Sequence, residues 1–209
     1  GLLGVITEVT VKILKSPEVA KAALVGFTSI QDAGNCVTEI IAKGIIPAGM
    51  EIMDKTLTKA TNDFSKAGYP VDAEAMMIIE LDGTDSEVSE LIERVEEIAK
   101  KNKCSSIKMS KSDAERSKFW AGRKAAFPAC AELAPDYMCM DGSIPRGKLA
   151  EVLKEIQKLS IKYGLPVANA FHAGDGNLHP LIMFNANDSE QLRKTEEFGA
   201  EILKYCVKV

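Results

Sequence analysis

The sequence predicts an α+β fold, in which an antiparallel sheet is covered by helices and built from ferredoxin-like repeats. Segments with strand and helix patterns follow in the order strand, helix, strand, strand, helix, strand, and a similar second set comes after them. This order favours antiparallel pairing, with the helices on one face of the sheet. Because no long linker rich in Pro, Gly or Ser separates the two sets, they can share one continuous sheet.

Apolar or alternating runs of strand length predict the strands of the first half. These runs cover residues 20–27, 50–53, 74–82 and 104–110. Ser29 begins the first helix, which ends at Gly44, and a weaker helix covers residues 55–66. Thr84 and Glu87 have the spacing of a capping box, so an amphipathic helix is expected to begin there.

The second half repeats this arrangement, with strands predicted over residues 137–142, 167–172 and 178–184. Ser112 caps a helix that is expected to run to about residue 132. Pro145 is placed in the first turn of the next helix, where its missing N–H costs nothing, and Gly164 ends that helix. Asp188 caps the last helix.

The composition excludes several classes of protein. The 209 residues include 26 Lys and Arg against 30 Asp and Glu, for a net charge of −4, so the chain lacks the basic character of a nucleic-acid-binding protein. No apolar run approaches the roughly 20 residues that cross a bilayer, so direct membrane insertion is not expected. The five cysteines are widely spaced and form no CxxC motif, which argues against a disulfide framework and suits a reducing cytoplasm.

Both histidines of the chain, His172 and His179, flank the turn sequence Gly-Asp-Gly-Asn at residues 174–177. These residue types tolerate the positive φ of tight turns. With the hairpin centred between residues 175 and 176, the two histidines lie directly opposite each other, with Cβ atoms about 4.5–5.5 Å apart. Two neutral imidazoles so placed can share a metal ion, with Asp175 or Asn177 orienting the rings.

The alternative is a pair of half-buried histidines on a hairpin with no ligand. A catalytic zinc ion normally has three protein ligands and an open position. Since the chain has no further histidine, the third ligand is an acidic residue or lies outside the chain.

Trp120, Arg123 and Phe127 form a second cluster, because spacings of three and four residues place them on one helix face. The planar guanidinium of Arg123 is suited to binding a carboxylate. The spacing alone favours the simpler alternative, in which the arginine stem packs on the aromatic rings while its charged end reaches water.

Three long segments resemble one known family, the C-terminal domain of FAD-linked oxidases of the vanillyl-alcohol oxidase type. The segments are Phe119–Pro128, Asp136–Arg146 and Phe171–Pro180, and the resemblance runs through nearly the whole chain. It implies FAD as the cofactor, bound mainly by another domain, and a divalent metal, zinc, held by His172 and His179. It also implies that Arg123 and Phe127 bind the substrate and that Asn177 contacts the cofactor.

The resemblance further divides the chain into residues 1–14, the last strand of an FAD-binding domain, and residues 15–209, the substrate domain. A Gly-Glu-His-Gly motif that follows the last helix in the family is absent here. That motif would supply the third metal ligand and the catalytic base, so no catalytic residue is assigned within this chain.

The implied chemistry is oxidation of a 2-hydroxy acid with hydride transfer to the flavin. Relatives that act on 2-hydroxyglutarate carry polar residues where Phe127, Cys139 and Leu181 stand, so a small monocarboxylate, glycolate or D-lactate, is expected. The family also implies a second flavin-domain subunit and an iron–sulfur subunit as partners. They would place the protein in the cytoplasm, peripheral to the inner membrane.

Two other hypotheses remain open from the sequence. A free-standing ferredoxin-like module that binds a small molecule would not need His172. A metal-dependent hydrolase built on the two histidines would bind a metal tightly with these 209 residues alone, although it lacks an obvious third ligand.

Overall fold

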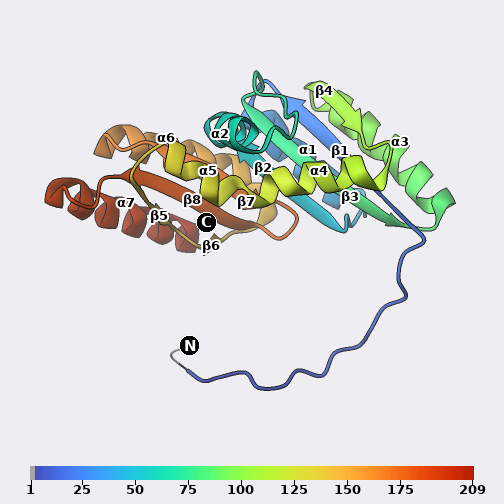
Figure 1. The fold of residues 1–209 in the computed structure, drawn as a ribbon, viewed down its shortest axis with the longest axis horizontal. Helices are drawn as coiled ribbons and strands as arrows, with labels where there is room; N and C mark the ends of the chain where they lie inside the picture. Colours follow the sequence, from blue (N-terminus) through green and yellow to red (C-terminus); the bar gives the residue numbers. More distant parts are fainter. Residues whose placement is uncertain (1–2) are drawn as a thin grey trace.

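The predicted strands form one eight-stranded antiparallel sheet in the computed structural model, which describes residues 3–209 (Figure 1). The strands are β1 (Val19–Phe27), β2 (Gly49–Asp54), β3 (Ala75–Gly83), β4 (Cys104–Met109), β5 (Asp136–Cys139), β6 (Gly142–Ser143), β7 (Val167–His172) and β8 (Asn177–Phe184). The helices are α1 (Ile30–Ala42), α2 (Lys55–Ser65), α3 (Asp85–Lys101), α4 (Asp113–Lys124), α5 (Ala126–Ala129), α6 (Leu149–Tyr163) and α7 (Ser189–Lys208). Short 3₁₀ turns follow α5 and precede α6, at Cys130–Glu132 and Arg146–Lys148.

The strand order confirms the ferredoxin-like prediction for the first half. Its elements β1, α1, β2, β3, α3 and β4 give the order β4-β1-β3-β2, with α2 inserted between β2 and β3. In the second half, β7-β8-β5 repeats three positions of that order, with α6 and α7 as its helices. The two halves share one sheet, because β2 pairs with β7 through Glu51–Met53 and Ala170–His172.

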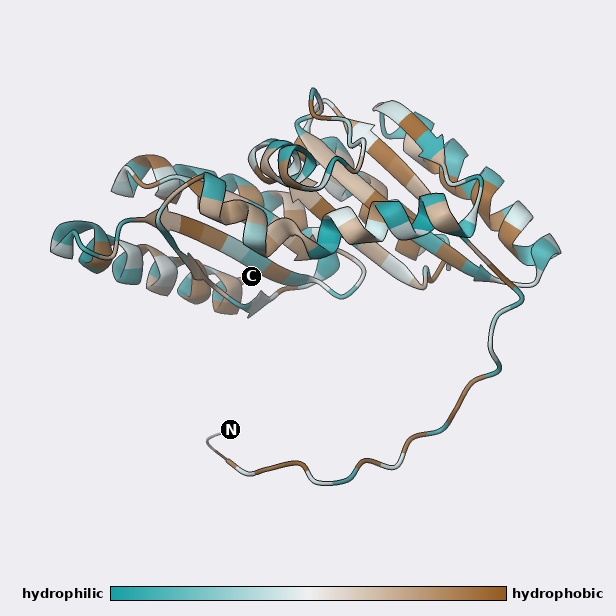
Figure 2. Cartoon of the chain, in the orientation of Figure 1, coloured by the Kyte–Doolittle hydropathy of each residue, from teal (hydrophilic) through white to brown (hydrophobic). Residues whose placement is uncertain are grey.

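Helices cover both faces of the sheet, so the prediction of a single covered face was wrong. One face packs against α1, α3, α6 and α7, and the other packs against α2, α4 and α5. The physical reason lies in β1 and β3, whose residues are apolar at odd and even positions alike. Figure 2 shows these apolar strands between helices that carry polar residues on their outer sides.

Cap residues place the helix ends as predicted. The Ser29 hydroxyl accepts hydrogen bonds from the backbone of Gln31 and Asp32 at the start of α1. Thr84 and Glu87 form the complete capping box of α3. The helix expected from Ser112 to residue 132 is instead divided into α4, α5 and a 3₁₀ turn. Pro128 explains this division, because its ring lacks an N–H and excludes the carbonyl of the residue four positions earlier.

The strand expected over residues 137–142 is also divided, into β5 and β6. Met140 donates its N–H to the carbonyl of Pro180 on β8, but Pro180 has no N–H to return a second bond. Pro145 precedes a 3₁₀ turn, and α6 begins only at Leu149.

Residues 3–14, the described part of the segment that the resemblance assigns to the last strand of an FAD-binding domain, form no strand in this structure. Residues 1 and 2 lie outside the described part, and residues 3–18 have no strand or helix and run away from the sheet (Figure 1). The apolar side chains of this segment, including Leu3, Val5 and Ile13, are exposed. A strand requires a partner strand for its hydrogen bonds, and residues 3–209 supply none to this segment. Its assignment to an FAD-binding domain remains a prediction.

None of the helices within residues 3–209 has both the length and the apolar character needed to cross a bilayer.

Candidate active site

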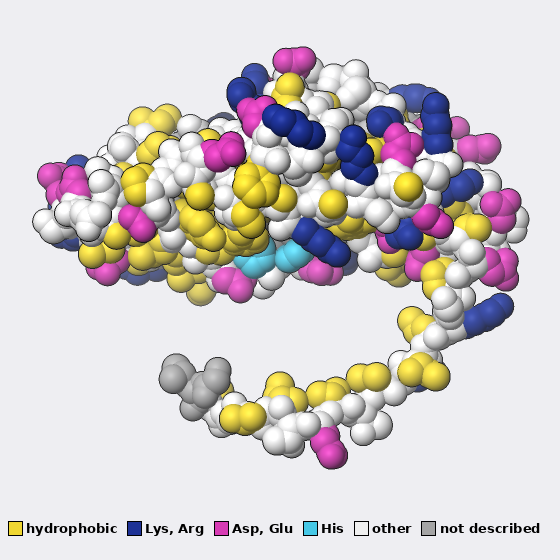
Figure 3. Space-filling view, in the orientation of Figure 1, with side chains coloured by type: hydrophobic (Ala, Val, Ile, Leu, Met, Phe, Trp, Pro, Cys, Tyr) yellow, Lys and Arg dark blue, Asp and Glu magenta, His cyan; other side chains and the backbone are white. Residues whose placement is uncertain are grey.

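The candidate site lies on the face of the sheet that α4 and α5 cover, where the two halves meet. Glu51 on β2, His172 on β7 and His179 on β8 point to this face, and Arg123 on α4 lies above them. Figure 3 shows the histidines together at the surface on this side, next to a group of apolar side chains. Tyr137 is about two-fifths exposed, and its ring centre lies 6.2 Å from that of Phe127.

The hairpin brings the two histidines together, although in a different register from the prediction. His172 lies opposite Asn177, and His179 lies opposite Ala170. The loop therefore comprises the four residues 173–176 and is centred one residue earlier than expected. Because the histidines remain on the same face as diagonal neighbours, their ring centres are 5.0 Å apart and their planes are at 89°.

The loop is held by its own backbone and by the segment before α6. The N–H groups of Asp175 and Gly176 both donate to the carbonyl of His172, at 3.0 and 3.1 Å. Ile144 donates its N–H to the Gly176 carbonyl, and Arg146 donates to the Gly174 carbonyl at 3.0 Å. The segment Asp141–Arg146 therefore supports the histidine hairpin.

Arg123 is buried, with 7% of its surface exposed, and its charge is balanced by Glu51. The guanidinium donates a hydrogen bond from Nε at 3.1 Å to Oε2 of Glu51, and Nη2 lies 2.9 Å from the same oxygen in an ion pair. The simpler alternative, with the charged end in water, is therefore wrong. Trp120, expected beside Arg123, instead directs its indole N–H to Glu80.

Phe127 lies on α5, beyond the break in the helix, yet it still reaches the site. Its ring centre is 6.3 Å from that of His179, in an edge-on arrangement. Leu181 is fully buried below the same face and lies opposite Cys139 on β5. Phe127, Cys139 and Leu181, the three positions that the sequence singled out, therefore lie on the same face of the sheet as the histidines.

Glu51 was not among the predicted site residues. Its Oε1 lies 2.6 Å from Nδ1 of His172, and its side chain is 12% exposed. The signal in the sequence was a carboxylate within an otherwise apolar strand, two residues before the buried Met53 on the same face. Carboxylates are seldom this buried without a charged partner, but the partners are 72 and 121 residues away.

The two histidines fit a metal ion as two of its ligands. Burial lowers the pKa of His179 below its ordinary value, with His172 and Arg123 adding to this and Asp141 opposing it. The neutral ring that results is the form that binds metals. Among residues 3–209, Nδ1 of His179 and Oδ1 of Asn177 are buried without a hydrogen-bond partner. The same residues contain no group of three or more His, Cys, Asp or Glu side chains arranged to hold a metal.

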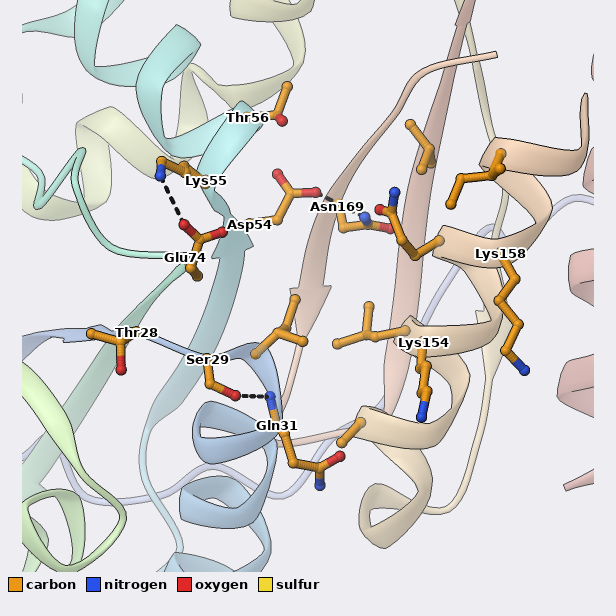
Figure 4. Close-up of a pocket in the computed structure, with 16 residues that line it drawn as sticks. Thr28, Ser29, Gln31, Asp54, Lys55, Thr56, Glu74, Lys154, Lys158 and Asn169 are labelled. Atoms are coloured by element: carbon orange, nitrogen blue, oxygen red, sulfur yellow. Dashed lines mark hydrogen bonds and ion pairs between the residues drawn. The ribbon is translucent and has the colours of Figure 1, made fainter. Parts of the chain in front are cut away.

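A separate cavity of about 660 Å³ lies on the opposite face, between α1 and α6 (Figure 4). At its floor, Asn169 donates a 2.8 Å hydrogen bond to the Asp54 carboxylate. Burial raises the pKa of Asp54 to about 6. Neither histidine lines this cavity, so it is distinct from the candidate site.

Comparison with known proteins agrees with this fold. Residues 16–209 match the family described as FAD linked oxidases, C-terminal domain. The chain belongs to this family. As expected from the resemblance, it is 53% identical over 209 residues to the glycolate oxidase subunit GlcD of Escherichia coli K12, covering 100% of this chain and 42% of the relative.

Other relatives of this FAD-linked oxidase domain extend the same pattern. Glycolate oxidase subunit GlcD of Bacillus subtilis is 32% identical, over 100% of this chain and 44% of its own length. The cytochrome-type D-lactate dehydrogenase of Arabidopsis thaliana mitochondria is 30% identical, over 95% of this chain and 35% of its own length. The chain therefore spans about two-fifths of the length of these two GlcD subunits.

Solved structures share the fold at much lower identity. p-Cresol methylhydroxylase with bound substrate gives a TM-score of 0.67 at 15% identity, covering 90% of this chain and 43% of that one. Alkyldihydroxyacetonephosphate synthase gives a TM-score of 0.65 at 14% identity, and the match covers 91% of this chain and 40% of that one.

Proposed function

We propose that the chain is the substrate domain of a flavin-dependent oxidoreductase that oxidises glycolate or D-lactate to the corresponding 2-oxo acid. The observation that carries this proposal is the convergence of a buried arginine and two histidines on one face of a domain of this family. The names of the relatives, glycolate oxidase subunit and D-lactate dehydrogenase, support the substrate class. Bound FAD would accept the hydride from the α-carbon.

Arg123 binds the substrate carboxylate in this proposal. Glu51 pairs with Nε and Nη2 on one side, which leaves the other side of the guanidinium for a second carboxylate. Phe127 and Leu181 close the apolar side of the site and favour a short substrate without a second charged group. Asn177, opposite His172, is the residue through which this domain contacts the cofactor.

His172 and His179 would hold a divalent metal, zinc, together with a ligand from outside the chain. Such a metal would polarise the α-hydroxyl of the substrate. The buried, unpartnered Nδ1 of His179 and its lowered pKa support a ligand at this position. The base that removes the hydroxyl proton is also proposed to lie outside the chain.

The visible spectrum of the polypeptide that carries this domain tests the proposal. Anaerobic addition of glycolate or D-lactate should bleach its flavin band, while D-2-hydroxyglutarate should act far more slowly. A flavin that neither small acid reduces would overturn the proposed function. Rapid bleaching by 2-hydroxyglutarate alone would overturn the substrate assignment but leave the flavin chemistry in place.

We further propose that this polypeptide works with a second flavin-domain subunit and an iron–sulfur subunit, which link it to the inner membrane from the cytoplasmic side. The names of the relatives, which are oxidase subunits, support a multi-subunit enzyme. Affinity purification from the native host, followed by iron and flavin analysis of the co-purified proteins, tests this arrangement.

A further inference from the structure

We infer that Glu51 is a positioning residue of the candidate site, which sets the tautomer of His172 and the orientation of Arg123 together. This inference deepens the proposed function and rests on it for its catalytic meaning. It is carried by one carboxylate that contacts both residues, through a different oxygen in each case.

The position of Glu51 in the sheet fixes both contacts. Its Cα lies opposite that of His172 in the short β2–β7 pairing, where the two halves of the domain join. The first half therefore supplies the carboxylate, and the second half supplies the imidazole. Arg123 approaches from α4 on the same face.

The 2.6 Å contact decides which nitrogen of His172 carries a proton. An ionised carboxylate only accepts hydrogen bonds, so the neutral ring must place its proton on Nδ1 to bond with Oε1 of Glu51. The lone pair of Nε2 is then free for a metal or a substrate hydroxyl.

The contact with Arg123 decides how the guanidinium faces the site. Glu51 accepts from Nε and pairs with Nη2, so the Nη1 side of the guanidinium faces away from Glu51. Since both side chains are largely buried, neither can turn to another partner without leaving a buried charge.

A second ion pair on the same face offers a matched control. Glu80 on β3 accepts hydrogen bonds from Arg116 and Trp120, and its side chain is 16% exposed, close to the 12% of Glu51. No hydrogen bond or ion pair joins Glu80 to either histidine within the described residues. Glu80→Gln therefore removes a comparable carboxylate without touching the site.

The tautomers of the two histidines are directly measurable by ¹⁵N NMR of the 209-residue chain, in which only two imidazoles resonate. At pH 8, the wild-type chain should show the neutral His172 ring with its proton on Nδ1. Glu51→Gln and Glu51→Leu should shift His172 toward the Nε2–H form, and Glu80→Gln should leave it unchanged. A wild-type protein in which Nε2 of His172 carries the proton would overturn the inference. This test does not require any variant to fold.

A kinetic measurement on the flavin-loaded polypeptide gives the second readout. Glu51→Gln should lower kcat/KM for the 2-hydroxy acid about 10–100-fold, the usual range for the outer partner of a metal-ligating histidine, and Glu80→Gln should not. Equal decreases of kcat/KM in both variants would overturn the positioning role of Glu51 and leave it only a structural role. If the NMR result holds but neither acid reduces the flavin, the proposed function fails while the tautomer assignment stands.

Discussion

Gly176 and Ile144 are in direct backbone contact: a Cβ built on Gly176 would overlap the carbonyl oxygen of Ile144. Gly176 also has a φ of 75°, in the left-handed region that side chains disfavour. The hairpin that carries both histidines can therefore close only with glycine at this position.

Gly176→Ala is expected to destabilise the chain by more than the conformational cost of about 1–3 kcal/mol that a left-handed non-glycine residue carries. Gly164→Ala is the control, because Gly164 has a similar φ of 66° but no atom near its added Cβ. Urea unfolding of both variants measures the difference. Equal decreases in the free energy of unfolding would mean that the backbone of Ile144 moves aside at no energetic cost.

Local signals in the sequence determined most of the fold. Caps such as Ser29 and Thr84, and apolar runs such as residues 167–172, act within a few residues, so their elements were predicted correctly. The hairpin register could not be predicted in this way. It depends on Ile144, which is distant in sequence and accommodates a four-residue loop ending at Gly176.

The site was predicted only where its residues lie close together in the sequence. His172 and His179 flank one turn, and Arg123 and Phe127 belong to a recognisable segment. Glu51 joins them through the pairing of β2 with β7, which no local pattern indicates. The predicted metal remains a proposal, because residues 3–209 supply two ligands and no group of three.

Asp54→Asn is expected to stabilise the chain near neutral pH but not at pH 4. The pKa of Asp54 is raised by burial from 3.8 to about 6, so the folded state holds its proton more tightly than the unfolded state does. The stability that the protonated group contributes is therefore complete below pH 4 and is lost as the pH rises through 6. This difference in pKa corresponds to a loss of up to about 3 kcal/mol at pH 7.

Asparagine at position 54 keeps the helix cap to Leu57 and can bond Asn169 after that amide turns. Denaturant unfolding from pH 4 to 8 measures the effect. Asp188→Asn is the control of opposite sign, because hydrogen bonds from the Gln191 and Glu190 backbone lower the pKa of Asp188. Parallel pH profiles for wild type and Asp54→Asn would contradict the prediction.

Zinc is expected to raise the melting temperature of the 209-residue chain, because an ion that binds only the folded state stabilises it. The shift should be small, since residues 3–209 contain no group of three or more His, Cys, Asp or Glu side chains arranged to hold a metal. His172→Ala and His179→Ala should each abolish it. Cys139→Ser, which removes an exposed thiol, should leave the shift intact, and a shift lost only in this variant would place zinc at the cysteine.

Arg123→Lys is expected to weaken substrate binding more than it slows the chemical step. Lysine keeps the charge but loses the planar fork that grips a carboxylate, so KM for the 2-hydroxy acid should rise at least tenfold while kcat falls less. Lysine has fewer N–H donors than arginine, so Glu51 is left poorly paired in a largely buried position. This should lower the free energy of unfolding by about 1–3 kcal/mol.

Steady-state kinetics of the flavin-loaded polypeptide and its urea unfolding give the two readouts for Arg123→Lys. Arg116→Lys is the matched control, since Arg116 pairs with Glu80 on the same face but reaches neither histidine. That variant should lose some stability and keep its KM. An unchanged KM in Arg123→Lys would show that Arg123 serves only to neutralise Glu51, and the carboxylate of the substrate would then need another cation.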